Sequence, residues 1–265
     1  MADLVYPRLI AAKLRSQLVY RSSFAIDLVT QAIAQGTELV VILVLFTHVT
    51  ALGGFSREEV LLMYAFAGAA FGVADLFAGQ LDNLPTYIRT GSFDVLLMRP
   101  LSTLPQIMCS DIRLRRIGRI TGALGVMVYA LAHVPIDWTP ARIALAVATP
   151  VAGAVIYSAV WVVACSICFW IVEGREFANA VTYGSNAFTS YPINVYSRPL
   201  RWLMAFVVPG AFVAYYPSLA LLGKQDPLGL PGWVGWTSPL VAVLAAVVAG
   251  FVWRFAVRHY RGTGS

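Results

Sequence analysis

The sequence predicts an all-α integral membrane protein with about six transmembrane helices. Of its 265 residues, 59% are hydrophobic and 12% are charged, whereas a soluble domain carries about 25% charged residues. A soluble chain of this length has no single core large enough for that much apolar surface. The apolar residues also form runs of about twenty, the length that crosses the hydrocarbon of a bilayer. We therefore expect one membrane domain over residues 1–265, with the lipid bilayer as its solvent.

The first 22 residues are expected to form an amphipathic helix on the membrane surface. Apolar residues such as Leu9 and Leu14 recur at helical spacing, and basic residues such as Arg8 and Lys13 lie between them. This pattern is typical of helices that lie in the interface plane. A frayed basic flank is the alternative for residues 1–22.

Six apolar runs are long enough to be membrane spans. They cover about 24–48, 60–79, 117–134, 143–171, 177–192 and 237–256. Residues 80–116 form the one long polar loop. Residues 198–224 are apolar, but Pro209 and Gly210 divide them into two pieces of about ten residues, half the length that crosses the hydrocarbon. A re-entrant or interfacial hairpin is expected there, because broken backbone at membrane depth is tolerated only when protein or water surrounds it. A seventh full span is the alternative.

The distribution of basic residues predicts the orientation. With six spans and both termini in the cytoplasm, fourteen of the 19 lysines and arginines lie inside and five outside, as the positive-inside rule requires. A seventh span would move the C-terminal arginines to the outside. Because the basic residues flank apolar runs and do not cover one soluble face, the charge of +6 does not indicate a nucleic-acid partner.

The motifs of common enzymes are absent from the sequence. It contains no P-loop, no GxSxG and no HExxH. The three histidines are far apart, and Cys165 and Cys168 have the spacing of one helix face in an apolar run, as packed thiols would. We predict no catalytic residue, no metal ligand and no cofactor bound by this chain.

The polar loop is expected to contain a short helix. Asn83 suits its N-cap, Pro85 its first turn and Gly91 the position just after its end. Such a helix is too short to be stable alone. We expect it to dock into a groove on a partner, and a connector that seals the bundle is the alternative. One face of the helix carries Leu84, Tyr87 and Ile88.

The residues after this helix carry a recognisable signature. The run Gly91-Ser92-Phe93-Asp94-Val95-Leu96-Leu97-Met98-Arg99-Pro100-Leu101 resembles the G-x-x-D-x-x-L-x-R-P-L signature of bacterial ABC transporter permeases of the type-two exporter class. The expected order of elements is similar along nearly the whole chain. The matching residues are Gly91, Asp94, Leu97, Arg99, Pro100 and Leu101.

This resemblance implies the permease subunit of an ATP-driven exporter in the bacterial inner membrane. Two copies of a separate ABC ATPase would bind ATP and Mg²⁺, and a second permease, identical or different, would complete the transporter. Asp94 and Arg99 would form an ion pair that braces the loop. The ATPase contacts would be Asn83, Leu84, Tyr87, Ile88 and Arg89, with a second contact at Glu173, Arg175 and Glu176.

An ion-coupled secondary transporter is the alternative function. It would need carboxylates near the bilayer midplane and an internal inverted repeat. Glu38 is the only deep acidic residue and the sequence shows no convincing repeat, so the permease is the better hypothesis.

Polar residues form a stripe on the first span. Asp27, Gln31, Gln35 and Glu38 are separated by four, four and three residues, which places them on one helical face. Because an ionisable group inside the bilayer must face protein or water, we expect the stripe to line the translocation path or the dimer seam. An internal hydrogen-bonded stripe against a neighbouring span is the alternative.

Pairs of glycines predict close helix packing. Gly68 and Gly72 lie on the second span, and Gly118 and Gly122 lie on the third; small residues at this spacing let two helices approach closely. Asp75, at the inner end of the second span, is expected to pair with an arginine of the inner loop.

Overall fold

The computed structural model describes residues 21–110, 115–171 and 174–260, and these residues form helices joined by turns, with no strand among them. The long helices are α2 (Arg21–His48), α3 (Arg57–Ala78), α7 (Arg115–His133), α8 (Pro140–Ser166), α9 (Arg175–Thr189) and α12 (Ser238–Arg258). The short elements are η2 (Gly79–Asn83), α4 (Leu84–Arg89), α5 (Ser92–Leu97), α6 (Thr103–Met108), η3 (Ile167–Phe169), η4 (Ile193–Val195), α10 (Arg198–Trp202), η5 (Leu203–Val207), η6 (Gly210–Phe212), α11 (Tyr215–Leu222) and η7 (Gly232–Trp236).

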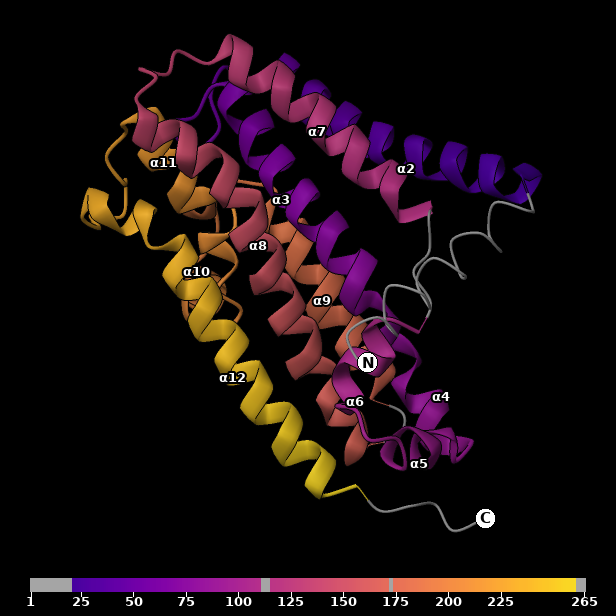
Figure 1. The fold of residues 1–265 in the computed structure, drawn as a ribbon. Helices are drawn as coiled ribbons and strands as arrows, with labels where there is room; N and C mark the ends of the chain where they lie inside the picture. Colours follow the sequence, from indigo (N-terminus) through magenta and orange to yellow (C-terminus); the bar gives the residue numbers. More distant parts are fainter. Residues whose placement is uncertain (1–20, 111–114, 172–173, 261–265) are drawn as a thin grey trace.

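Helix α3 is the centre of the bundle, with α7 and α8 packed along it (Figure 1). Every residue from Glu59 to Gly72 is buried. The helix starts at a capping box, in which the Ser56 hydroxyl accepts the Glu59 N–H and the Glu59 carboxylate accepts the Ser56 N–H at 2.9 Å. This arrangement satisfies two backbone groups that the helix end would leave unpaired.

The glycines of α3 set its distance from α7. A Cβ built on Gly72 would lie 2.9 Å from Cγ1 of Ile120, and one built on Gly68 would lie 3.3 Å from Cβ of Ala123. Larger side chains would therefore push the helices apart. The close packing predicted for Gly68 and Gly72 is confirmed.

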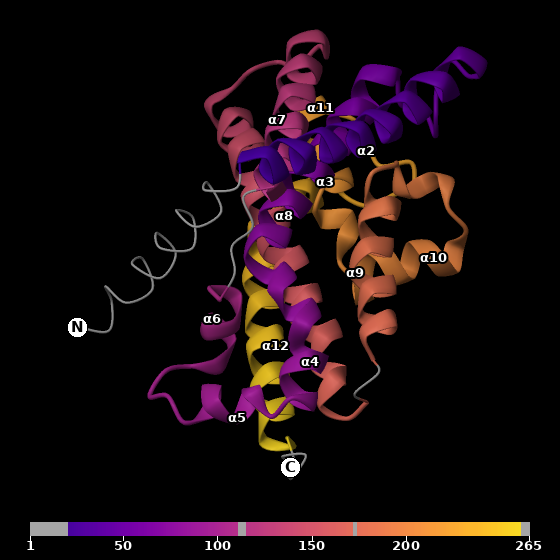
Figure 2. The same cartoon turned by 90° about the vertical axis from the view of Figure 1, so that its right-hand side faces the viewer.

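Helix α2 extends away from the rest of the bundle (Figures 1 and 2) and packs mainly against α7. Most of its apolar side chains are exposed, as at Ile33 and Val44. The expected amphipathic helix at residues 1–22 lies outside the described residues, apart from its last two positions, which belong to α2.

Each of the six expected spans corresponds to a helix. By length and composition, the candidate spans among the described residues are α2, the run Arg57–Arg89, α8 extended to Phe169, and α12. Helices α7 and α9 are not among these candidates. Helix α7 has 19 residues with arginines in its first turns, and α9 has 15 residues. The segments Arg198–Val207 and Gly210–Leu222 are bent by 72° at Pro209. The bend falls at the predicted break, and neither arm alone reaches the roughly 20 residues of a full span; the expected hairpin and the alternative seventh span both contain such a bend.

The end of the bundle that the distribution of basic residues predicts to be cytoplasmic carries a compact elbow. Helix α3 continues through η2 into α4, and the chain then turns through α5 and α6 before it enters α7. In Figure 2, α4 and α5 lie at the same end of the molecule as the end of α12 and the start of α9. We call residues 84–108 the inner elbow.

Candidate functional site

The expected short helix is present as α4. Pro85 occupies its first turn, as predicted. Gly91 follows its end with φ of 67°, a left-handed conformation that glycine adopts without strain, and this turn leads into α5.

The prediction that Asn83 caps the helix is wrong. Its backbone is already helical, with φ of −89° and ψ of 0°, because η2 runs directly into α4. The side-chain amide of Asn83 instead donates to Oε1 of Gln80 at 3.3 Å. The physical reason is that a helix entered from a helical turn has no free N–H groups for a side chain to cap.

The expectation that the apolar face of α4 is free to dock on a partner is also wrong. Leu84 and Ile88 are 0% and 3% exposed and belong to the protein's own core. Tyr87 is half-buried, and its hydroxyl lies 3.4 Å from Oγ of Ser110. The short helix is stabilised by its own bundle, and its exposed residues are polar, as at Arg89.

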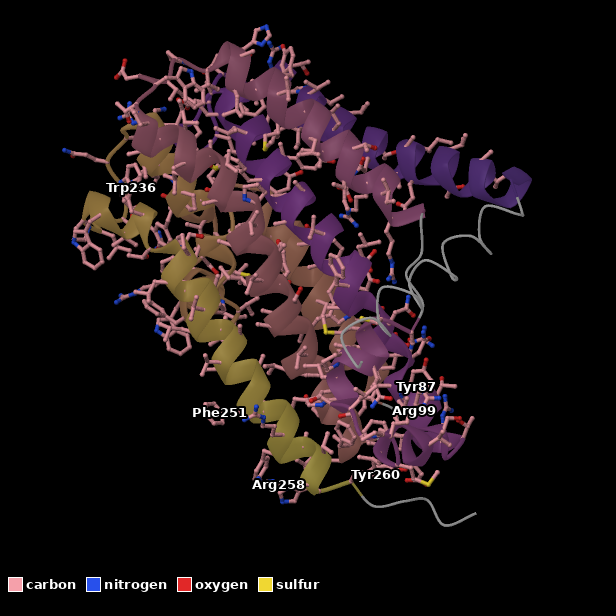
Figure 3. The ribbon with its side chains drawn as sticks, viewed as in Figure 1. Tyr87, Arg99, Trp236, Phe251, Arg258 and Tyr260 are labelled. Carbon is pink, nitrogen blue, oxygen red and sulfur yellow. The ribbon has the colours of Figure 1, made fainter. Side chains whose placement is uncertain are left out.

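The large exposed apolar side chains of the inner elbow lie instead on α5 and at the residue that follows it. Val95 is 46% exposed, Leu97 43% and Met98 78%. Exposed arginines flank them at positions 89 and 99 (Figure 3 labels Tyr87 and Arg99 at this end). Sequence reasoning missed Val95 and Met98, although their spacing of three residues on a short helix indicates one face. We call Arg89, Val95, Leu97, Met98 and Arg99 the elbow patch.

Four aromatic rings hold the elbow to the ends of two spans. Phe93 of α5 is fully buried and makes edge-to-face contacts with Phe169 of η3 at 5.2 Å and with Tyr260, just after α12, at 4.8 Å between ring centroids. Phe169 packs in the same way on Trp253 of α12 at 5.4 Å. Trp253 Nε1 also donates to the hydroxyl of Thr103 at 3.1 Å. We call the four rings the aromatic clasp; the residues come from three distant segments, and sequence reasoning missed them.

A side chain outside the signature run Gly91–Leu101 forms hydrogen bonds with two of the backbone carbonyl groups of the run. The side-chain amide of Gln106 donates to the carbonyl oxygens of Leu96 and Leu101, at 3.1 and 2.9 Å. Gln106 is buried, so these bonds fix the loop with little competition from water.

The predicted ion pair between Asp94 and Arg99 does not form. Among the described residues, no cationic nitrogen of Arg99 lies within 4 Å of the Asp94 carboxylate. Helix α5 ends at Leu97, so Asp94 lies within the helix and Arg99 lies in the bend after it, and both side chains are exposed. Asp94 lies near Tyr260, and burial, followed by this carboxylate, raises the pKa of the Tyr260 phenol.

A polar cluster lies directly above the elbow. Asp82 accepts hydrogen bonds from Trp161 Nε1 of α8 at 2.7 Å and from the Tyr183 hydroxyl of α9 at 3.2 Å. The expected pairing of Asp75 with an arginine is confirmed, because Arg116 Nε lies 3.0 Å from its carboxylate and both side chains are buried. The inner end of α3 is thereby joined to α7, α8 and α9.

The structure divides the polar stripe of α2. Gln35 Nε2 donates to the backbone carbonyl of Arg119 at 2.8 Å, as the internal-stripe alternative predicts. Glu38 is exposed and accepts a hydrogen bond from the buried Tyr64 hydroxyl at 3.3 Å. Gln31 is half-buried, and the side chain of Asp27 lies outside the described residues.

The second expected partner contact lies at the start of α9. Arg175 and Glu176 are exposed in its first turn, while Glu173 lies outside the described residues. This turn is at the same end of the bundle as the elbow (Figure 2). Within the described part of the chain, no three His, Cys, Asp or Glu side chains are grouped as ligands of a metal ion.

The chain matches a known protein family. A family model described as "ABC-2 family transporter protein" matches residues 32–264, which is most of the chain and includes the elbow and the hairpin. No curated protein and no solved structure matches the chain.

Proposed function

The chain belongs to the ABC-2 transporter family and is a multi-pass membrane permease of an ABC transporter, and from this premise we propose that it forms half of an ATP-driven exporter. Two copies of a separate ABC ATPase bind on the cytoplasmic side and hold ATP and Mg²⁺. A second permease, identical or different, completes the translocation path. The chain lies in the bacterial inner membrane with both termini in the cytoplasm.

The elbow patch is the proposed docking surface for the ATPase. This assignment is supported by the 78% exposure of Met98 at the tip of an otherwise well-anchored elbow. Apolar side chains exposed singly are ordinary, but three of them within residues 95–98, with exposed arginines close by in the sequence, are typical of a protein interface. Arg175 and Glu176, at the same end of the bundle, are the proposed second contact.

The contacts of the elbow support a route by which ATPase movement reaches the spans. Helix α4 is continuous with α3 through η2, so a displacement of the elbow acts directly on the central helix. The aromatic clasp joins α5 to the ends of α8 and α12, and Asp82 joins η2 to α8 and α9. A push on the elbow therefore reaches four of the helices together.

The exposed part of the α2 stripe is proposed to face the translocation path or the second permease. Glu38 supports this proposal, because its side chain is exposed on a helix of membrane-spanning length and composition. A carboxylate facing hydrocarbon is costly, so protein or water must cover it in the assembled transporter.

Co-purification with a candidate ABC ATPase tests the docking surface. Met98→Asp is expected to reduce the ATPase retained by tagged permease by about 30-fold, since a central interface residue contributes about 2 kcal/mol or more. Leu228→Asp is the matched control, because Leu228 is 37% exposed in the loop between α11 and η7, at the opposite end of the bundle. If Met98→Asp retains as much ATPase as Leu228→Asp, the docking assignment is wrong.

A further inference from the structure

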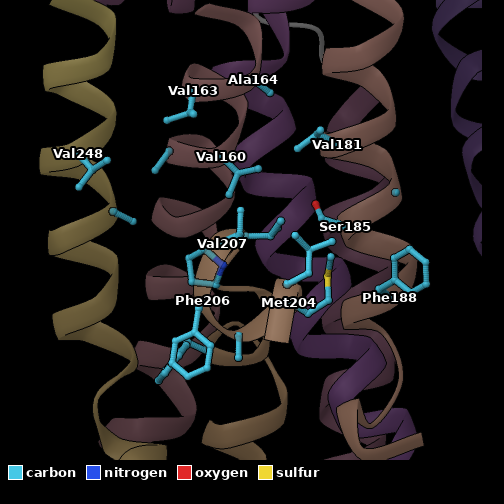
Figure 4. Close-up of a pocket in the computed structure, with 18 of the residues that line it drawn as sticks. Val160, Val163, Ala164, Val181, Ser185, Phe188, Met204, Phe206, Val207 and Val248 are labelled. Atoms are coloured by element: carbon cyan, nitrogen blue, oxygen red, sulfur yellow. The ribbon is translucent and has the colours of Figure 1, made fainter. Parts of the chain in front are cut away.

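A wide apolar groove lies between α8, α9, η5 and α12 (Figure 4). Its volume is about 1090 Å³. Each of the three long helices contributes one stripe of residues at helical spacing, as Val241, Leu244, Ala245 and Val248 do on α12. Among the described lining residues Ser185 has the one polar side chain, and its hydroxyl already donates to the Thr182 carbonyl at 2.7 Å. The groove therefore offers its occupant an apolar surface.

Small residues keep this groove open. The lining includes Gly184 of α9, and a Cβ built there meets no atom within 4 Å. Ala180 lines the same stretch of α9, and Ala245 lines the facing stretch of α12. Protein interiors are close-packed, and a space of this size slightly exceeds the roughly 300–1,000 Å³ of typical small-molecule sites. An empty groove would lose the dispersion contacts of all its lining atoms, so an apolar occupant is favoured.

The groove opens sideways between membrane-spanning helices. Side chains at its rim are exposed, with Phe177 and Val207 both at 56% and Val248 at 55%. Helices α8 and α12 are both candidate spans. The medium at the rim is therefore the hydrocarbon of the bilayer, and an acyl chain reaches the groove without crossing water.

Two arginines precede the wall that η5 contributes. Arg198 and Arg201 belong to α10, which continues directly into η5. Among the residues that the structure describes, neither has an ion-pair partner within 4 Å. Trp202, beside them, is 60% exposed. Arginine beside an exposed tryptophan is typical of the headgroup region, where arginine binds phosphate.

We propose that the groove binds an acyl chain of an anionic phospholipid from the surrounding bilayer, with the phosphate at Arg198 and Arg201. The bound lipid fills the space between α9 and α12 and packs the broken hairpin against α8. This inference goes beyond the transport assignment, because it depends on the groove and on the membrane and not on ATP.

Photolabelling tests the proposal directly. The full-length permease is reconstituted in vesicles of phosphatidylglycerol and phosphatidylcholine that contain a phosphatidylglycerol analogue with a diazirine near the end of one acyl chain, and labelled peptides are mapped by mass spectrometry. Labelling is expected to concentrate at groove residues such as Val181 and Val248, above the level at Val243 and Val247, which lie on α12 outside the groove. Equal labelling of both sets would overturn the proposal.

A matched pair of glycine variants separates the groove from the rest of the surface. Gly184→Phe places a ring in the groove and is expected to lower labelling of Val181 about tenfold, the effect of about 1.4 kcal/mol on binding. Gly250→Phe is the control, because a Cβ there also meets nothing within 4 Å but Gly250 does not line the groove. Ala245→Phe serves if Gly184→Phe does not elute as a single species. If both groove variants label like the control, lipid does not occupy the groove.

Two further experiments test where the lipid headgroup binds and whether protein occupies the groove in place of lipid. Arg198→Gln combined with Arg201→Gln is expected to abolish the preference for the phosphatidylglycerol analogue over a phosphatidylcholine analogue. A preference that persists would overturn the phosphate assignment. A diazirine amino acid at Val248 that cross-links a second copy and no lipid would show that protein fills the groove, and would also overturn the proposal.

Discussion

Phe93 is expected to control the stability of the inner elbow. Its ring is fully buried and touches Phe169 and Tyr260 at centroid distances of 5.2 and 4.8 Å. An aromatic pair contributes about 0.5–1.5 kcal/mol beyond the burial of its area. Phe93→Leu keeps an apolar side chain but loses both pairs, so it is expected to destabilise α5 by about 1–3 kcal/mol. Phe93→Ala also removes buried volume, and its cost rises to about 3–5 kcal/mol.

Amide hydrogen exchange measures this local stability. The Met98 N–H donates to the Asp94 carbonyl at 3.1 Å and reports whether α5 is folded. Because about 1.4 kcal/mol is a tenfold change in an equilibrium constant, Phe93→Leu is expected to speed exchange at Met98 by about 5- to 150-fold. Phe93→Ala is expected to bring the exchange close to the rate of an unfolded peptide.

Val95→Ala is the matched control for Phe93. Val95 lies on the same helix but is 46% exposed, and surface substitutions of this kind change stability by about 0.5 kcal/mol or less. Exchange at Met98 is expected to change by about twofold at most in this variant. Equal acceleration by Phe93→Leu and Val95→Ala would refute the aromatic clasp as the anchor of the elbow.

Three further predictions concern other parts of the molecule. Tyr183→Phe removes one donor from Asp82 and is expected to cost about 0.5–1.5 kcal/mol, measured by thermal unfolding in detergent; a double-mutant cycle with Asp82→Asn that shows no coupling would contradict the bond. Lys224→Gln leaves the buried Glu59 carboxylate without the ammonium that lies 2.6 Å from it and is expected to cost about 1–3 kcal/mol, less than a fully buried pair because Lys224 is 39% exposed. Adding Glu59→Gln is expected to restore part of that loss, and no recovery would count against the pair. Burial raises the pKa of the Cys109 thiol, so its thiolate fraction at neutral pH is lower than in an exposed cysteine. The rate of alkylation is therefore expected to increase over a higher pH range than that of a free thiol. A pH profile equal to that of a free thiol would contradict the burial of Cys109.

Local sequence patterns predicted the elements of this fold well. The six apolar runs correspond to helices, and the break at Pro209 falls where the hairpin bends by 72°. Gly91 takes the left-handed conformation expected after a short helix. Each of these features depends on residues close together in the chain, where period, breaking residues and capping preferences act.

Contacts between distant segments could not be predicted. The apolar face of α4 suits a partner's groove and the chain's own core equally well, and the core is what buries Leu84 and Ile88. The bond from Trp161 to Asp82 joins residues 79 positions apart. Phe93 meets Tyr260 only because α5 lies beside the C-terminal end of α12. Such pairings depend on how whole helices pack against one another. No local pattern in the sequence encodes that packing.

Site-specific cross-linking from the elbow patch tests the central claim most directly. A photoreactive amino acid is placed at Met98 in the membrane-embedded permease co-expressed with its ATPase, and at Leu228 as the control at the opposite end of the bundle. A cross-link to the ATPase is expected from position 98 and none from position 228. A permease that cross-links lipid or itself from position 98, and never the ATPase, would contradict coupling through the inner elbow.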